Sequence, residues 1–128
     1  MIIFVKHMAE HNILGRSGEL LAAEYLENKG YMVLDRNWRS GHKELDLVAR
    51  SGNTLVVVEV KTRGSARFGN PEDAVDMRKI RRLVLATDAY LRLKCLDMNV
   101  RFDIVTIIDS GGKVTVEHIE DAFFPPIG

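Results

Sequence analysis

The pattern of apolar and polar positions along the chain predicts two helices and five strands. Apolar residues at helical spacing predict the helices at residues 14–29 and 70–93. Gly30 would end the first helix, and Asn70 would be the N-cap of the second. The inward face of the second helix is expected to carry Ala74, Met77, Ile80, Val84, Thr87 and Leu91. Alternating and β-branched runs predict the strands at residues 31–38, 43–51, 54–63, 100–108 and 113–119.

This order, one helix, three strands, one helix and two strands, predicts an α/β sandwich around a mixed sheet. The run 55–60 is apolar on both faces apart from Glu59, which is typical of a central strand covered on both sides. We expect one domain over residues 14–120, because the chain is too short for two cores. An extension (1–13), whose start could add a short strand, precedes the domain, and a tail (121–128) follows it.

A tight turn at Gly52-Asn53 determines how the second and third strands pair. Counting outward from this turn places Asp46 opposite Glu59. Two residues further on, it places Glu44 opposite Lys61. Directly opposed residues share one face of a sheet, with Cβ atoms about 4.5–5.5 Å apart, and so do residues two apart in one strand. Three carboxylates and one ammonium group are therefore expected to converge on one patch.

Such a patch needs neutralisation, because like charges opposed on a sheet repel and ionised groups leave water only when they are paired. One lysine cannot neutralise three carboxylates, whereas a divalent cation can. Hard oxygen ligands of this kind favour Mg²⁺ or Mn²⁺. The alternative is a structural salt-bridge cluster, in which Glu44 pairs with Lys61 and Asp46 is solvated.

The same residues carry a resemblance to a known family. Asp46, followed across a hairpin by Glu59-Val60-Lys61, resembles the active-site signature of the PD-(D/E)XK nuclease superfamily. The chain as a whole resembles the YraN family of predicted endonuclease-like proteins, itself similar to archaeal Holliday-junction resolvases. His42-Lys43 departs from that family, which usually has a glycine before the glutamate of this strand. The segments that carry the resemblance are residues 15–26, 36–39, 44–49, 58–63, 68–75 and 101–105.

The resemblance implies a fold and a set of roles. The fold would be a restriction-endonuclease-like three-layer sandwich, in the order α-β-β-β-α-β-β around a mixed central sheet. Asp46 and Glu59 would hold Mg²⁺ or Mn²⁺, with the carbonyl of Val60 as a third ligand. Lys61 would assist the attacking water.

Two further acids complete the candidate catalytic set. Glu19 opens the inward row of the first helix and would lean toward the metal, as the equivalent helix acid does in the resolvases that the chain resembles. Its alternative is an acid favoured by the positive end of the helix macrodipole. Glu44 would complete the metal site or hold a water beside it.

Cationic segments lie on both sides of the hairpin and supply candidate contacts with nucleic acid. Lys and Arg side chains there could bind a phosphate backbone, and Trp38 could stack on a base. The alternatives are a core position for Trp38 and a solvated face for the basic helix. The candidate residues are Arg36, Trp38, Arg39, Lys43, Arg63, Arg67, Arg78, Lys79 and Arg82.

Composition constrains the partners and the compartment. The formal net charge is zero, so a phosphate-binding surface must arise from local segregation of charge. A single cysteine, Cys95, suits a reducing cytoplasm. No apolar run approaches the roughly 20 residues that span a bilayer, so we expect a cytoplasmic protein without a membrane partner. A homodimer would suit a small nuclease that acts on two strands, and Phe123 and Phe124 are its candidate contacts.

Two functions are compatible with these residues. The first is a Mg²⁺-dependent endonuclease that hydrolyses phosphodiester bonds in nucleic acid, with DNA, including branched DNA, as the expected substrate. The second is a non-catalytic module that binds nucleic acid or a protein on a nuclease fold and retains the acids as a structural cluster. The complete set of Asp46, Glu59 and Lys61 favours the first, because a degenerate site would be expected to lack one of them.

Overall fold

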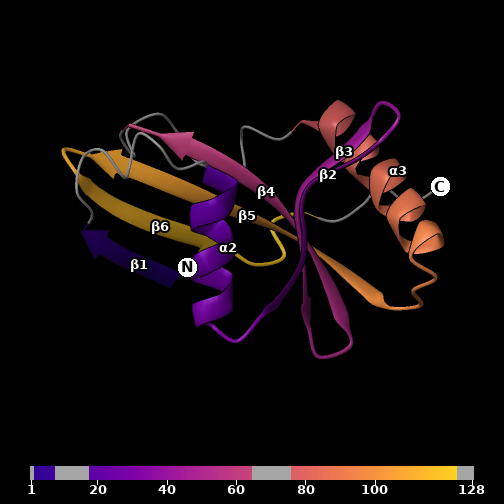
Figure 1. Ribbon diagram of the computed structural model, residues 1–128. Coiled ribbons are helices and arrows are strands. Elements are labelled where there is room, and N and C mark those ends of the chain that lie inside the picture. Colours follow the sequence, from indigo (N-terminus) through magenta and orange to yellow (C-terminus); the bar gives the residue numbers. More distant parts are fainter. Residues whose placement is uncertain (1, 8–17, 65–75, 124–128) are drawn as a thin grey trace.

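The computed structural model describes residues 2–7, 18–64 and 76–123 of the chain, and its elements carry the labels of Figure 1. Asn70 and Pro71, predicted at the start of the second helix, lie outside these residues, as do Arg67, Ala74 and Phe124. The elements are β1 (Ile2–His7), α2 (Gly18–Asn28), β2 (Met32–Ser40), β3 (Lys43–Ser51), β4 (Thr54–Arg63), α3 (Met77–Leu93), β5 (Asn99–Ser110) and β6 (Lys113–Ile119).

The strands form a six-stranded mixed sheet in the order β1-β6-β5-β4-β3-β2 (Figure 1). β4 and β5 are parallel, and the other neighbouring pairs are antiparallel. All five predicted strands are present in the predicted order, and the N-terminal extension contributes a sixth, β1, which pairs with β6. The protein is therefore a mixed α/β fold, as the sequence pattern predicts.

The two described helices contribute to separate hydrophobic cores, and β4 lies between these cores. Val56 and Val58 of β4 pack in the core of α2, whereas Leu55 and Val57 pack in the core of α3. Side chains of a strand alternate between faces, so β4 is buried on both sides, as its sequence predicts. Full burial of such a side chain stabilises the fold by about 1.5–3 kcal/mol, so β4 contributes to the stability of both cores.

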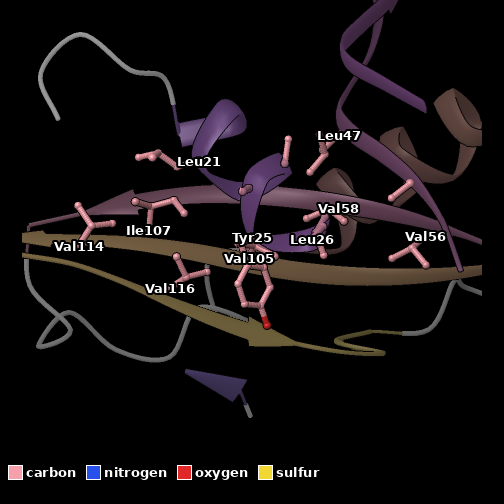
Figure 2. Close-up of a cluster of buried hydrophobic side chains, with 13 residues drawn as sticks. Leu21, Tyr25, Leu26, Leu47, Val56, Val58, Val105, Ile107, Val114 and Val116 are labelled. Atoms are coloured by element: carbon pink, nitrogen blue, oxygen red, sulfur yellow. The ribbon is translucent and has the colours of Figure 1, made fainter. Parts of the chain in front are cut away.

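The core under α2 is built from aliphatic side chains and one tyrosine. Leu21, Tyr25 and Leu26 of α2 point toward the sheet, where they meet side chains of β4 and β5 (Figure 2). Gly30, with a positive φ of 94°, follows the helix end, as predicted. Neither described helix is long and apolar enough to cross a membrane.

The α3 helix buries most of the predicted inward stripe. Ile80 and Thr87 are buried, and Val84 and Leu91 are half-buried against the core, as predicted. Met77, expected to point inward, is 49% exposed. The full buried row of the helix is Ile80, Leu83, Ala86, Thr87 and Tyr90. The Tyr90 hydroxyl donates a hydrogen bond to Asp35 Oδ2 at 2.7 Å, which connects this face of the helix to β2.

Two aromatic side chains proposed for partners lie in the cores. Trp38 is half-buried and packs edge-to-face on Tyr90, with ring centroids 5.2 Å apart, which is the alternative that the sequence left open. Phe123 stacks on Phe102, also at 5.2 Å, and packs against the core of α3. The tail therefore contributes Phe123 to the packing of the domain, and the homodimer stays a prediction.

A buried polar network joins α2, β5 and β6. Asp103 is fully buried, and its carboxylate accepts hydrogen bonds from Arg101 Nε at 2.9 Å and Nη2 at 2.8 Å. Its Oδ2 also lies 2.7 Å from His118 Nε2, while His118 Nδ1 lies 3.1 Å from the hydroxyl of Tyr25. Burial alone would raise the pKa of Asp103, but the hydrogen bonds from His118 and Arg101 outweigh it and hold that pKa below its usual value.

Replacement of Asp103 by alanine should destabilise the fold by about 3–5 kcal/mol, because it leaves Arg101 and His118 without their buried partner. The measurement is urea unfolding at pH 7, with the exposed Asp97→Ala as a matched control expected to lie within about 0.5 kcal/mol of wild type. The ionised carboxylate contributes above its unfolded pKa of about 3.9 and loses this contribution as the pH falls through the lower folded pKa. The difference should therefore shrink in acid; a loss at pH 7 no greater than that of the control would contradict the network's role.

Candidate functional site

The candidate site lies where β3 separates from β4. The pairing of these strands runs from Ser51–Thr54 to Leu47–Val58, in the predicted register, and stops there. Both strands continue: β3 stays paired with β2, and β4 stays paired with β5. The hairpin of β2 and β3 thus diverges from β4 and extends alongside α3 (Figure 1). The site opens in the resulting fork.

Asp46 occupies the end of the interrupted ladder. Its Oδ2 accepts a hydrogen bond from the backbone N–H of Val60 at 2.9 Å, so a side chain takes the place of the strand partner. Burial and the negative charge of Glu59 raise the pKa of Asp46 to about 6, although the Val60 N–H acts in the opposite direction. The charge of Glu19 raises it further and that of Lys79 lowers it. Asp46 is thus a half-buried acid whose negative charge is only partly compensated by its neighbours.

Glu59, only 4% exposed, is held by two ammonium groups. Lys79 Nζ of α3 lies 2.6 Å from Glu59 Oε1, and Lys61 Nζ of β4 lies 3.4 Å from the same oxygen. Burial lowers the pKa of Lys79, but the hydrogen bond and charge of Glu59 outweigh that effect, so its pKa is raised overall. Lys79, proposed from sequence as a nucleic-acid contact, is therefore also the closest cationic partner of Glu59.

Glu19 reaches this site because the start of α2 lies close against β4. A Cβ on Gly18 would stand 2.5 Å from Thr62 Oγ1 and 3.4 Å from a methyl carbon of Val60. Only glycine permits that approach without a shift of the neighbours. The next residue, Glu19, then lies near enough for its charge to act on Asp46.

Glu44 does not occupy its predicted position opposite Lys61. The β3–β4 ladder has ended before this point, and Glu44 is instead the register partner of Arg39 in β2. The two side chains form an exposed ion pair, with Arg39 Nε 3.4 Å from Glu44 Oε2. Asp46 does not pair directly with Glu59 either, because its carboxylate accepts a hydrogen bond from the backbone N–H of Val60 instead. The carboxylates of the candidate metal site are therefore Asp46, Glu59 and Glu19. Glu44 lies beside this site and pairs with Arg39.

A cleft of about 570 Å³ lies over Asp46 and Glu59. Its lining comes from the β2–β3 turn on one side and from α3 on the other. Sequence reasoning missed much of this lining, because neighbours brought together by the turn and the helix are far apart in the chain. The lining residues are Ser40, Gly41, His42, Lys43, Glu44, Asp46, Glu59, Lys79, Arg82, Leu83 and Leu85.

The predicted cations divide into two groups. Lys43, Lys79 and Arg82 line the cleft. The remaining described ones do not line it: Arg36, Arg39 and Arg78 are exposed, and the half-buried Arg63 donates to the backbone carbonyl of Thr62 at 3.2 Å. The structure therefore gathers cations from β3 and α3 at the cleft rather than along one continuous basic segment.

A second group of potential metal ligands lies in the buried network. Oxygen and nitrogen atoms of Asp103, His118 and Glu120 lie within 4.8 Å of one another, a spacing that could hold a metal ion. Arg101 already supplies positive charge there, because it binds both oxygens of Asp103 and lies 3.5 Å from Glu120 Oε1. No arginine among the described residues binds both oxygens of Asp46 or of Glu59 in this way. We therefore consider these two acids the better candidate for a metal site.

Comparisons with known proteins identify relatives over nearly the whole chain. Residues 18–107 match the family described as "Uncharacterised protein family UPF0102". A UPF0102 protein of Phocaeicola vulgatus is 58% identical over 120 residues, which cover 94% of this chain and 99% of the relative. A UPF0102 protein of Bacteroides thetaiotaomicron is 54% identical with the same coverage. One of Christiangramia forsetii is 50% identical over 117 residues, covering 91% of this chain and 98% of the relative.

Asp46→Asn should stabilise the protein at pH 8 by on the order of 2 kcal/mol, because a carboxylate whose folded pKa is raised to about 6 is strained when ionised. Asparagine keeps an oxygen to accept from Val60. At a pH between the pKa of Asp46 in the unfolded chain and its pKa in the folded protein, Asp46 is protonated only in the folded protein. The stability of the wild type therefore falls as the pH rises through this window. The gain of the variant should therefore vanish near pH 4.

This prediction is tested by urea unfolding of both proteins at pH 4 and pH 8. Glu44→Gln, which removes an exposed carboxylate of the same strand, is the control and should change stability by less than about 0.5 kcal/mol. An Asp46→Asn protein that is less stable than wild type at pH 8 would show that the carboxylate is well compensated and is not a strained functional acid.

Proposed function

The chain belongs to the UPF0102 family, and from its site we propose that it is a metal-dependent endonuclease that hydrolyses phosphodiester bonds in DNA. The observation that supports this most is that Asp46 and Glu59 line one cleft, where Glu59 is held by Lys79 of the cleft lining and by Lys61 of β4. The combination supplies hard oxygen ligands, positive charge for a phosphate and space for a substrate strand. It is also the set of residues that the resemblance to PD-(D/E)XK nucleases implies.

The donor set of the fork suits Mg²⁺ or Mn²⁺. Among the described residues, hydrogen bonds and ion pairs engage Oδ2 of Asp46 and Oε1 of Glu59, which leaves the second oxygen of each carboxylate for a cation. Burial and the charge of Glu59 raise the pKa of Asp46, so a cation bound beside it would stabilise the ionised carboxylate. The ligands would be Asp46, Glu59 and the Val60 carbonyl, with Glu19 as a further acid. When bound, the ion would activate water and stabilise negative charge on the leaving oxygen.

The protein's own residues would position the reactants. Lys61 would donate a hydrogen bond that orients the attacking water in line with the scissile bond. Lys79 and Arg82 would bind the phosphate oxygens and balance their charge. In the reaction, the water oxygen bonds to phosphorus, the bond to the departing sugar oxygen breaks, and a proton passes to that oxygen. Glu59 would hold both lysines in place through its ion pairs.

Cleavage of a labelled panel of nucleic acids with Mn²⁺ tests the proposal. The panel contains branched, flapped, single-stranded and double-stranded DNA, together with RNA. Wild type should cut DNA, and Glu59→Gln, which preserves side-chain shape, should lose at least about 100-fold in rate. Glu27→Gln, an exposed acid on α2, is the matched control and should cut normally. Binding of the panel in EDTA without any cleavage in Mg²⁺ or Mn²⁺ would instead support the non-catalytic binding module.

Lys61→Ala should separate the roles of the lysine and the acids. We expect turnover to fall by about 10²–10⁴-fold, because the water loses its orienting donor, while Mn²⁺ binding measured by calorimetry stays close to wild type. The exposed Lys113→Ala is the control. If Lys61→Ala abolished Mn²⁺ binding, Lys61 would be needed to assemble the metal site, and the division of roles proposed here would be wrong.

A further inference from the structure

The cleft has the size of a small-molecule pocket. Its volume of about 570 Å³ falls within the range of about 300–1,000 Å³ that is usual for such pockets. A nucleotide fits that space. An intact duplex does not, because its two backbones and paired bases form a rod that is much wider than a single nucleotide.

The acids lie at the floor of this cleft and not on its rim. Glu59 is only 4% exposed, and Asp46 is half-buried under the same walls. A phosphodiester bond must therefore enter the cleft to reach them. In a paired duplex the bases hold each phosphate at the helix surface, whereas an unpaired nucleotide can leave the stack and bring its phosphate inward.

The walls offer contacts for a base as well as for a phosphate. Lys43 and Arg82 supply positive charge from opposite walls. Leu83 and Leu85 supply an apolar surface on α3, and His42 places an aromatic ring on the turn across from it. Leu85 is 60% exposed, an uncovered apolar side chain at the edge of a charged site. Apolar and aromatic side chains of this kind bind the faces of unstacked bases.

We infer that the cleft binds a single unpaired nucleotide, with its base against Leu85 and its phosphate over Asp46 and Glu59, so that DNA is cut beside unpaired positions. The role of Asp46 and Glu59 as the cleavage site in this inference rests on the proposed endonuclease function. The preference for binding an unpaired nucleotide follows from the cleft alone. The substrate class is therefore DNA with a bulge, flap or loop, and fully paired duplex is a poor ligand.

Binding in EDTA tests the inference without any cleavage. The probes are two DNA hairpins whose strands are joined by a flexible non-nucleotide linker, so that neither has an unpaired loop. Both contain 2-aminopurine, unpaired as a single bulge in one and paired with thymine in the other. The bulged hairpin should bind about tenfold or more tightly, and its fluorescence should change on binding because the base leaves its stack and meets the protein. Equal affinities for the two hairpins would overturn the inference.

A matched pair of helix variants locates the base. Leu85→Ala should weaken binding of the bulged hairpin by about fivefold or more and leave the weak binding of the paired hairpin unchanged. Leu93→Ala is the control, because Leu93 lies on the same helix, is 63% exposed and does not line the cleft. Both residues are exposed, so neither change should unfold the protein. Identical binding by the two variants would overturn the role of Leu85.

Cleavage of the same hairpins in Mn²⁺ distinguishes the two proposals. If the bulged hairpin binds preferentially and stays uncut, the endonuclease function is wrong and the nucleotide-binding cleft stands. If both hairpins are cut at the same rate, the endonuclease function stands and the cleft inference is wrong. Preferential binding and preferential cutting beside the bulge would support both.

Discussion

The separation of β3 from β4 after the Leu47–Val58 pair is the constraint on which the site depends. A continued ladder would pair Asp46 and Glu59 directly and leave no space between the strands. Where the ladder stops, the N–H of Val60 needs a new acceptor, and Asp46 supplies it. The Asp46 carboxylate thus accepts the hydrogen bond that the interrupted ladder leaves unmade, and it lies close enough to Glu59 for the two charges to interact. The positions of Asp46 and Glu59 therefore follow from the end of the β3–β4 ladder.

Tertiary contacts on the α3 side hold the fork open. A register shift between Val33 and Asp35 marks an irregularity in β2, and such bulges bend and twist a strand. Tyr90 of α3 then binds Asp35 through its hydroxyl and packs its ring against Trp38. These contacts attach the β2–β3 hairpin to the helix that supplies Lys79. The aromatic contacts of β2 therefore build the wall of the cleft.

The two acidic clusters of the protein differ in how their charge is balanced. Asp103 receives two hydrogen bonds from Arg101, another contact from His118 and the backbone N–H of Asp121, and its pKa is held low. Asp46 receives one backbone hydrogen bond beside a second carboxylate, and its pKa is raised. The first arrangement stabilises the fold. In the second, the charges of Asp46 and Glu59 repel each other, and a bound cation would relieve this repulsion. Such an arrangement is typical of a functional site.

The element order, the central position of β4 and the register set by the turn at Gly52-Asn53 could be predicted from the sequence, because apolar periodicity and turn chemistry are local properties. The same register predicted Asp46 and Glu59 as a pair. The point where that register ends is a property of the folded protein, and there Glu44 meets Arg39 and not Lys61. The placement of α3 against the sheet, which brings Lys79 Nζ within 2.6 Å of Glu59 Oε1, is another. Both depend on packing between segments far apart in the chain, which no local pattern records.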